Sequence, residues 1–244
     1  MHYLSTLLET SQGLICLVGS GGKTTLMFKL ANYLASKEKR VLTTTTTKIR
    51  PPNHTQSPFL ECVSDPLQWL RNRLQSCPCK HISLAASFDK KNNKLLGYHP
   101  KSIDRIWEED FFDWIIVEAD GAAQRPLKAP GSREPVLCSK SSHVIALVGL
   151  EGIDKRLNTE NVFRVKEYAD LSGLRPEESI NPSAAADVIV SPQGLFKGIP
   201  EQAQAIACLN KVDKCPSTGY RLKQLLLAQG YRTVLGSLNK NYFK

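Results

Sequence analysis

Short apolar runs alternate with amphipathic segments along this chain, which is the pattern of β-α units on a mostly parallel sheet. The first apolar run, residues 14–18, stops abruptly at a glycine-rich stretch. Leucines at helical spacing follow, so we predict a helix over residues 23–37. Threonine-rich residues 40–45 predict a second strand, because β-branched side chains favour extended backbone.

The same alternation continues to the end of the chain. The predicted strands are 81–87, 114–117, 144–148, 205–209 and 231–235, and the predicted helices are 66–74, 159–171, 182–190 and 218–229. Residues 89–97 predict a hairpin turn. No linker divides the chain, so we expect one nucleotide-binding domain over residues 1–244, with a small insertion around 50–105 where the pattern is less regular.

A glycine-rich loop separates the first strand from the first helix. Its residues are Gly19, Ser20, Gly21, Gly22, Lys23, Thr24 and Thr25. Glycines let backbone N–H groups surround phosphate oxygens, and the following helix adds its positive end. In this interpretation Lys23 reaches the β and γ phosphates and Thr24 ligates Mg²⁺. The fold class predicted is therefore α/β and P-loop NTPase-like, a mostly parallel sheet flanked by helices.

The spacing of this loop departs from the commonest P-loop form. The commonest form has a glycine six residues before its lysine, but that position is Leu17 here. In this chain the loop glycine that precedes Lys23 at a distance is Gly19, four residues before it. The shorter form resembles Mur-type ATP-dependent ligases. A ligase or kinase acting on a small carboxylate or hydroxyl is therefore an alternative function.

Two carboxylates stand at the tip of the predicted strand 114–117. They are Glu118 and Asp120, followed by Gly121. P-loop proteins place the acidic residue that orders Mg²⁺ at such a strand end, so both are candidate metal and catalytic residues. The sequence does not distinguish which of the two serves, and an exposed acidic turn is the alternative.

Two further polar segments follow predicted strands. The threonines of residues 43–47 either face the phosphates or form a half-buried strand. Asn210, Lys211 and Asp213 match the guanine-reading tetrad of GTPases, in which the aspartate accepts hydrogen bonds from the base. A solvated turn is the alternative for the second segment, so both ATP and GTP stay open.

Charge and cysteine usage narrow the setting. The net charge of +9 favours anionic partners, and nucleotide phosphates satisfy it without a nucleic-acid-binding motif, so we do not expect nucleic acid. The first 13 residues lack a signal-peptide pattern, and no apolar run of about 20 residues predicts a membrane span. Seven cysteines, several of them inside apolar runs, favour the reducing cytoplasm; Cys77 and Cys79 fit a loop better than a zinc site.

Taken in order, the motifs resemble the YqeC family over nearly the whole chain. The segments that carry the resemblance are 18–25, the threonine run, 118–121, Pro126-Leu127-Lys128-Ala129-Pro130, Glu134-Pro135-Val136 and 148–150. Lys48 and Arg133 stand where histidine is expected from the family pattern. The order of these motifs along the chain is far more specific than any single motif.

The resemblance implies an accessory protein for selenium-dependent molybdenum hydroxylases. Its expected role is nucleotide-dependent maturation of the enzyme or its molybdenum cofactor, through a slow NTPase that uses Mg²⁺ with ATP or GTP. A candidate anion site for a phosphorylated cofactor consists of Arg125, Lys128, Arg133 and Arg164; these cations are otherwise surface charges or partners of Glu134 and Glu118. A non-catalytic nucleotide sensor is the remaining alternative.

Overall fold

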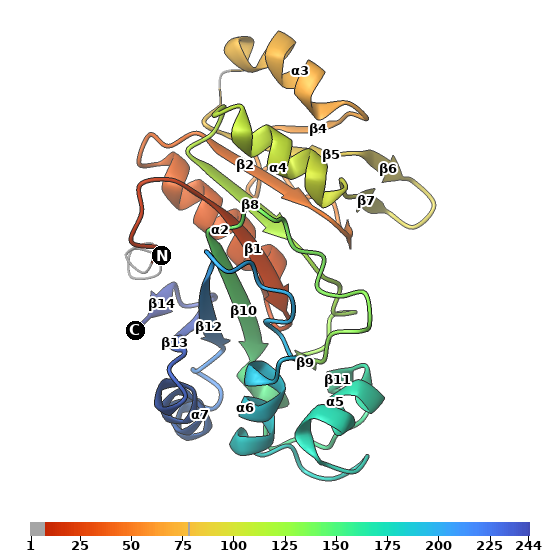
Figure 1. Ribbon diagram of the computed structural model, residues 1–244, viewed down its shortest axis with the longest axis vertical. Helices are drawn as coiled ribbons and strands as arrows, with labels where there is room; N and C mark the ends of the chain where they lie inside the picture. Colours follow the sequence, from red (N-terminus) through yellow and green to blue (C-terminus); the bar gives the residue numbers. More distant parts are fainter. Residues whose placement is uncertain (1–7, 78) are drawn as a thin grey trace.

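The computed structural model describes residues 8–77 and 79–244, so seven of the residues on which the signal-peptide expectation rests lie outside it. Within the described residues the chain builds a nine-stranded sheet in the order β14-β13-β12-β10-β1-β8-β2-β5-β4 (Figure 1). Every neighbouring pair is parallel except β13 and β14. The central strands are buried on both faces, which is why they read as continuous apolar runs.

The strands of this sheet, in chain order, are β1 (Gly13–Gly19), β2 (Val41–Thr45), β4 (Leu60–Cys62), β5 (His81–Ala85), β8 (Trp114–Glu118), β10 (His143–Gly149), β12 (Gln204–Asn210), β13 (Arg232–Ser237) and β14 (Tyr242–Phe243). Two small sheets lie beside it. One contains β3 (Lys48–Ile49), β6 (Ser87–Asp89) and β7 (Lys94–Leu96); the other contains β9 (Leu127–Lys128) and β11 (Val162–Phe163).

Helices cover both faces of the large sheet. They are α2 (Lys23–Ala35), α3 (Pro66–Arg73), α4 (Pro100–Glu108), α5 (Val165–Ser172), α6 (Pro182–Val190) and α7 (Pro216–Ala228), with short 3-10 helices at Leu74–Ser76 and Leu150–Gly152. Helix α2 packs into one hydrophobic core and α3 to α7 contribute to the other, on opposite faces of the sheet (Figure 1). The predicted α/β class with a mostly parallel sheet is confirmed, and it is consistent with a P-loop NTPase-like fold.

The parallel sheet brings the motifs to one edge. Strands β1, β8, β2 and β12 end respectively at Gly19, Glu118, Thr45 and Asn210. Because the carboxyl ends of parallel strands share an edge, the loop, the acidic strand end, the threonines and the 210–213 tetrad all face the same side.

Two elements differ from the sequence prediction. The helix expected over 159–171 starts only at Val165, because Val162 and Phe163 pair with β9 and Arg164 has a left-handed backbone (φ 69°). Helix α4 was not predicted. In the 50–105 region β4 and β5 join the large sheet, while β6 and β7 form the small sheet with β3.

No helix in the described part of the chain is long and apolar enough to cross a membrane.

Candidate functional site

The glycine-rich loop adopts a backbone that only glycine accommodates easily. Gly19, Gly21 and Gly22 have φ values of 84°, 81° and 136°, all positive. A Cβ atom on Gly21 would lie 2.4 Å from the Cα atom of Gly149, and one on Gly22 would lie 2.7 Å from Nδ2 of Asn210. The three glycines therefore fix a turn that packs directly against the ends of two neighbouring strands.

Hydrogen bonds from three other strand ends brace the loop. The Ser20 amide donates to the Leu147 carbonyl (2.8 Å) and the Gly19 amide donates to Asp120 Oδ2 (2.9 Å). The Asn210 side-chain amide donates to the Gly21 carbonyl (2.7 Å). The loop is thus held in place by β8, β10 and β12 together.

Lys23 begins α2 and is almost fully buried. Its Nζ donates to the Gly19 carbonyl (2.7 Å) and lies 3.1 Å from Asp120 Oδ1 and 3.8 Å from Glu118 Oε1. Burial alone would lower the pKa of Lys23, but the charges of Asp120 and Glu118 outweigh it and raise that pKa. The lysine is therefore a fixed positive charge inside the loop.

Thr24 and Glu118 form the next contact. The Thr24 hydroxyl donates to Glu118 Oε2 at 2.7 Å. Burial raises the pKa of Glu118, while the Lys23 charge and the Thr24 hydrogen bond act to lower it. A hydroxyl and a carboxylate thus stand side by side at the start of α2, where hard oxygen ligands would be needed for Mg²⁺.

Asp120 lies deeper than Glu118. Its Oδ2 accepts from the Gly19 amide and lies 2.9 Å from Lys128 Nζ, and its Oδ1 faces Lys23. The side chain is 1% exposed. Asp120 therefore joins the loop to the segment after β8, whereas Glu118 opens on the solvent-accessible side.

A chain of buried charges continues from Asp120. Lys128 is fully buried and donates to the Gly121 carbonyl and to Glu134 Oε2, both at 2.6 Å. Arg164 binds the same Glu134 carboxylate through both terminal nitrogens. Burial acts to raise the pKa of Glu134, but the Arg164 and Lys128 contacts overcome it, and that pKa is lowered.

The four predicted anion-site residues are therefore not gathered in one place. Lys128 and Arg164 both pair with Glu134, as the alternative interpretation expects, and Lys128 also pairs with Asp120, where that interpretation named Glu118. Arg133 is exposed, and only Arg125 lines the cavity described next.

A cavity of about 570 Å³ opens in front of the loop. Its walls are contributed by residues 21–25, by Lys48 to Pro51 with Gln56 and Lys94, by Gly121 to Pro126, and by Glu118, Glu151 and Lys211. This volume lies within the range of small-molecule sites, about 300–1,000 Å³. The predicted loop and acidic residues therefore border a space large enough for a nucleotide-sized ligand.

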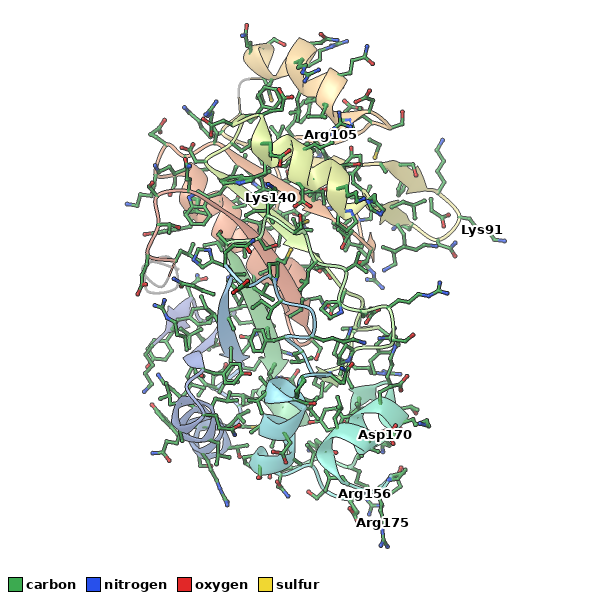
Figure 2. All side chains as sticks on the ribbon, viewed as in Figure 1. Lys91, Arg105, Lys140, Arg156, Asp170 and Arg175 are labelled. Carbon is green, nitrogen blue, oxygen red and sulfur yellow. The ribbon has the colours of Figure 1, made fainter. Side chains whose placement is uncertain are left out.

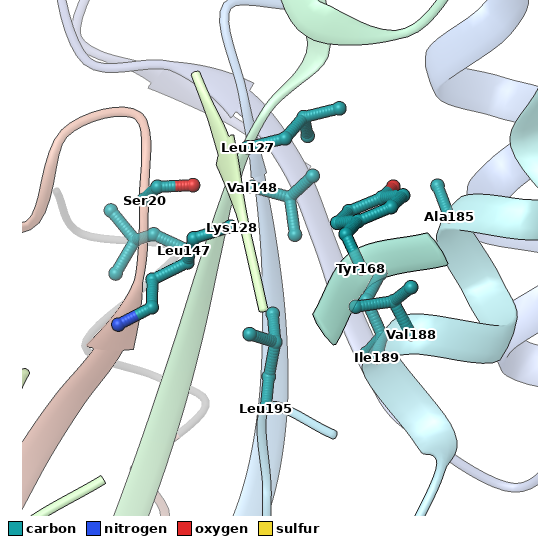
Figure 3. A pocket seen from close by; sticks show the side chains of 10 residues that line it. All are labelled: Ser20, Leu127, Lys128, Leu147, Val148, Tyr168, Ala185, Val188, Ile189 and Leu195. Atoms are coloured by element: carbon teal, nitrogen blue, oxygen red, sulfur yellow. The ribbon is translucent and has the colours of Figure 1, made fainter. Parts of the chain in front are cut away.

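A second hollow lies behind the loop and has a different character. Figure 3 shows it between β10 and helices α5 and α6, lined mainly by apolar side chains such as Val148, Tyr168 and Ile189. Its volume is only about 10 Å³. It is a packing gap in the core, too small for a ligand.

The threonine run serves the sheet. Thr43 contacts Ser83 (2.6 Å between hydroxyl oxygens), Thr44 donates to the Leu84 carbonyl (2.8 Å), and Thr45 donates to the Glu118 carbonyl (2.8 Å). These hydroxyls satisfy backbone and side-chain groups of neighbouring strands, which agrees with the structural alternative.

The 210–213 tetrad lies beside the loop. Asn210 is buried, and its Oδ1 accepts from the amides of Lys211 (2.8 Å) and Leu238 (2.9 Å). Lys211 lines the cavity and pairs with Glu151. Asp213 is exposed, and a hydrogen bond from Ser237 lowers its pKa. The tetrad thus combines a structural asparagine with two side chains on the solvent side.

Several cavity residues were not identified from the sequence as a group. Arg50, Lys94 and Glu151 were missed, and Lys48 was noted only as a departure from the family pattern. The signal present was the Lys48-Ile49-Arg50 alternation, because residues two apart in an extended segment share a face. Cys77 and Cys79 are free thiols, and within residues 8–77 and 79–244 no group of three or more His, Cys, Asp or Glu side chains forms a metal cluster.

A glycine-rich loop between a central strand and its helix, beside an acidic strand end, places the chain among α/β proteins consistent with a P-loop NTPase-like fold. Comparison with known proteins defines it further. A family model described as YqeC protein matches residues 15–166. "Uncharacterized protein YqeC" of Escherichia coli (strain K12) is 35% identical over 203 residues, which cover 82% of this chain and 77% of that relative. This chain belongs to the YqeC family.

Proposed function

We propose that this protein binds a nucleoside triphosphate with Mg²⁺ at residues 19–25 and hydrolyses it slowly. The observation that carries the proposal is the braced glycine loop at the start of α2, which opens on the 570 Å³ cavity with Lys23, Thr24 and Glu118 at its base. Backbone amides and a helix N-terminus favour phosphate oxygens at such a position.

The residues present fit a magnesium ion. Thr24 Oγ1 and Glu118 Oε2 are 2.7 Å apart, and both residues line the cavity. Mg²⁺ in phosphate sites uses one or two protein oxygens together with phosphate oxygens and water. When bound, it would neutralise charge on the terminal phosphates. Lys23 Nζ would donate to an oxygen of the same phosphates, in place of its hydrogen bond to the Gly19 carbonyl.

For the base we propose guanine. Asn210 already ties the tetrad to the loop, and Lys211 and Asp213 follow it on the solvent side. An adenine site remains the alternative, because Asp213 is exposed and is not among the residues that line the cavity.

The biological role we propose is maturation of a selenium-dependent molybdenum hydroxylase or its molybdenum cofactor. Support for this step is the YqeC family relationship alone. A ligase or kinase is favoured by one separate observation, the size of the cavity, which extends well beyond the loop. The sensor alternative predicts binding without turnover.

Binding of labelled ATP and GTP, each with and without Mg²⁺, tests the proposal directly. We expect Mg²⁺-dependent binding, a preference for GTP, and formation of the nucleoside diphosphate and inorganic phosphate on product analysis. Absence of binding for both nucleotides by the folded protein would refute the proposed function. Binding with no turnover, even with a molybdenum cofactor and a hydroxylase present, would favour the sensor.

A further inference from the structure

Three cations form a wall of the cavity away from the glycine loop. Lys48 pairs with Leu96 and Ile49 pairs with Leu95 across β3 and β7. Arg50 directly follows β3, and Lys94 begins β7, so the two residues lie at the same end of this strand pair. All three side chains, Lys48, Arg50 and Lys94, line the cavity.

The wall carries three cations and has two carboxylates nearby, Asp89 and Glu118, which the charges of Lys48 and Lys94 respectively reach without a direct ion pair. None of the three side chains makes an ion pair or hydrogen bond with the described residues, while Lys23 and Lys211, the other lysines of the cavity, are both paired with carboxylates. Asp89 lies across from Lys94 on β6; its two oxygens accept hydrogen bonds from the Asn92 amide and side chain, and the Lys48 charge also acts on it, so one negative charge remains beside three positive ones. An unbalanced set of this kind is suited to an anion.

The wall is also rigid. Ile49 and Leu95, on the opposite face of the small sheet, are buried at 5% and 3% exposure. The Gly97 amide donates to the Thr47 carbonyl (2.8 Å) and the Tyr98 amide donates to the Thr45 carbonyl (2.9 Å). These contacts fix the end of β7 against the end of β2. An anion would therefore meet cations whose backbone positions are already set.

Strand order puts the wall on the opposite side of the loop from the proposed base site. In the sequence β12-β10-β1-β8-β2, the tetrad follows β12 and the wall follows β2, with the loop after β1 between them. The Lys94 charge acts on Glu118, lowering its pKa against the stronger effect of burial. A nucleotide that extends from the loop toward Asp213 would direct its terminal phosphate toward Glu118 and the wall.

We propose that Lys48, Arg50 and Lys94 form a second anion site, which holds a phosphate monoester on a small-molecule substrate next to the terminal phosphate of the nucleotide. The inference rests on the proposed nucleotide site for its orientation, but the anion site itself consists of different residues. A phosphate carries nearly two negative charges and three acceptor oxygens, which suits three cations better than one carboxylate does.

Calorimetric titration with inorganic phosphate and with glycerol 3-phosphate tests the site. The protein is titrated both free and saturated with Mg²⁺ and GDP or ADP. We expect two phosphate sites in the free protein and one in the nucleotide-saturated protein. The double variant Lys48→Ala/Lys94→Ala should weaken the remaining site at least tenfold and leave the nucleoside diphosphate Kd within twofold. Lys23→Ala should instead remove the loop site.

Lys90→Ala/Lys91→Ala is the matched control. It removes two charges from the turn of the same hairpin, where the Lys91 side chain extends into solvent at the tip (Figure 2). This variant should bind phosphate as the wild type does. Equal weakening in both double variants would reduce the effect to net charge and overturn the proposal.

Two further outcomes are distinguishable. If Lys48→Ala/Lys94→Ala weakens a non-hydrolysable triphosphate as strongly as it weakens phosphate, and no phosphate binds beside that nucleotide, the wall serves the nucleotide's own γ-phosphate and the second site is refuted. If neither nucleotide binds, but phosphate binding still depends on Lys48 and Lys94, the proposed nucleotide function fails and the anion site stands.

Discussion

The side-chain amide of Asn210 donates a hydrogen bond to the carbonyl of Gly21, 2.7 Å away and 189 positions earlier in the chain. Asn210 in turn accepts from the Leu238 amide. The end of β12 therefore positions the glycine loop as well as carrying the tetrad, and the two predicted nucleotide motifs form one connected structure.

Asp213→Ala should reduce the preference for GTP over ATP without loss of fold. The reason is that a carboxylate facing guanine accepts from its N1 and N2 donors, which adenine lacks. Asp213 is exposed, so its removal leaves the core unchanged. Equilibrium binding of both nucleotides to wild type and variant is the measurement. Tighter binding of ATP than GTP by the wild type would contradict the guanine assignment.

Lys23→Ala should lower triphosphate affinity at least tenfold, because it removes the charged side chain of the loop that we propose contacts the β and γ phosphates. Lys37→Ala, which removes an exposed lysine just beyond the same helix, is the control. Titration with a non-hydrolysable triphosphate measures the effect. Unchanged affinity in a folded Lys23→Ala variant would remove the basis of the loop assignment.

Glu118→Gln should bind nucleotide nearly normally and hydrolyse it far more slowly. Glu118 contacts Thr24 and lines the cavity, so in the proposed mechanism its charge would matter mainly in the transition state, where a metal ion and the attacking water would be ordered. Asp120→Asn should affect binding as well, because Asp120 holds the Gly19 amide. Single-turnover and binding assays separate the two. Wild-type turnover in both variants would make the acidic strand end structural.

Lys128→Ala should destabilise the protein by about 3–5 kcal/mol, since it leaves Asp120 and Glu134 without their shared buried partner. Arg164→Ala should cost less, because Glu134 keeps Lys128. Urea unfolding measures both. Lys166→Ala, which breaks the exposed pair with Asp170, should cause no measurable change. A Lys128→Ala variant as stable as the wild type would show that the buried charges are not coupled.

Acid should destabilise the fold through His81. Burial lowers the pKa of His81 to about 4 from 6.5, so between these values the unfolded chain binds a proton that the native protein excludes. Stability from this group is present above pH 6.5 and falls as the pH drops toward 4, by about 3 kcal/mol in total at ~1.4 kcal/mol per pH unit. Burial lowers the pKa of His143 too, with the same sign.

His81→Gln should flatten the stability profile over this interval, although it is expected to be less stable at neutral pH, because the ring bridges Asn32 and Thr43. Urea midpoints collected from pH 7 to pH 4 give the comparison. An equally steep loss of stability in His81→Gln would assign the acid sensitivity to other groups.

Local patterns predicted those elements whose signals are contained within a short segment. Helix α6 has the predicted limits, Pro182 and Val190, because Asn181 caps it and proline begins it. The helix prediction was wrong for the residues before Val165, because β11 pairs with β9, about 35 positions earlier, and this pairing overrides the helical pattern. The basic wall was likewise missed as a group, because Lys48 and Arg50 are close in the sequence but Lys94 joins them only through the pairing of β3 with β7 across more than 40 residues.

The same contrast between local and long-range signals applies to the candidate site. The loop, Glu118 and Asn210 could be found because strand, turn and polar residue are adjacent in the sequence. The different depths of Glu118 and Asp120, and the pairing of Lys128 with Glu134, arise from how the segment after β8 folds back on the loop. The spacing of residues in the sequence does not predict that this segment folds back on the loop.

The hydrogen bonds that hold the glycine loop also determine when during synthesis the loop can take its final form. Partners on β8, β10 and β12 follow the loop by about 100 to 190 positions, so a nascent chain that has exposed only its first strand and helix holds no shaped anion site. The third brace forms only when residue 210 has been synthesised and β12 has joined the sheet. A chain truncated before residue 210 would therefore keep β1, β8 and β10 but lack the hydrogen bond from Asn210 to the Gly21 carbonyl.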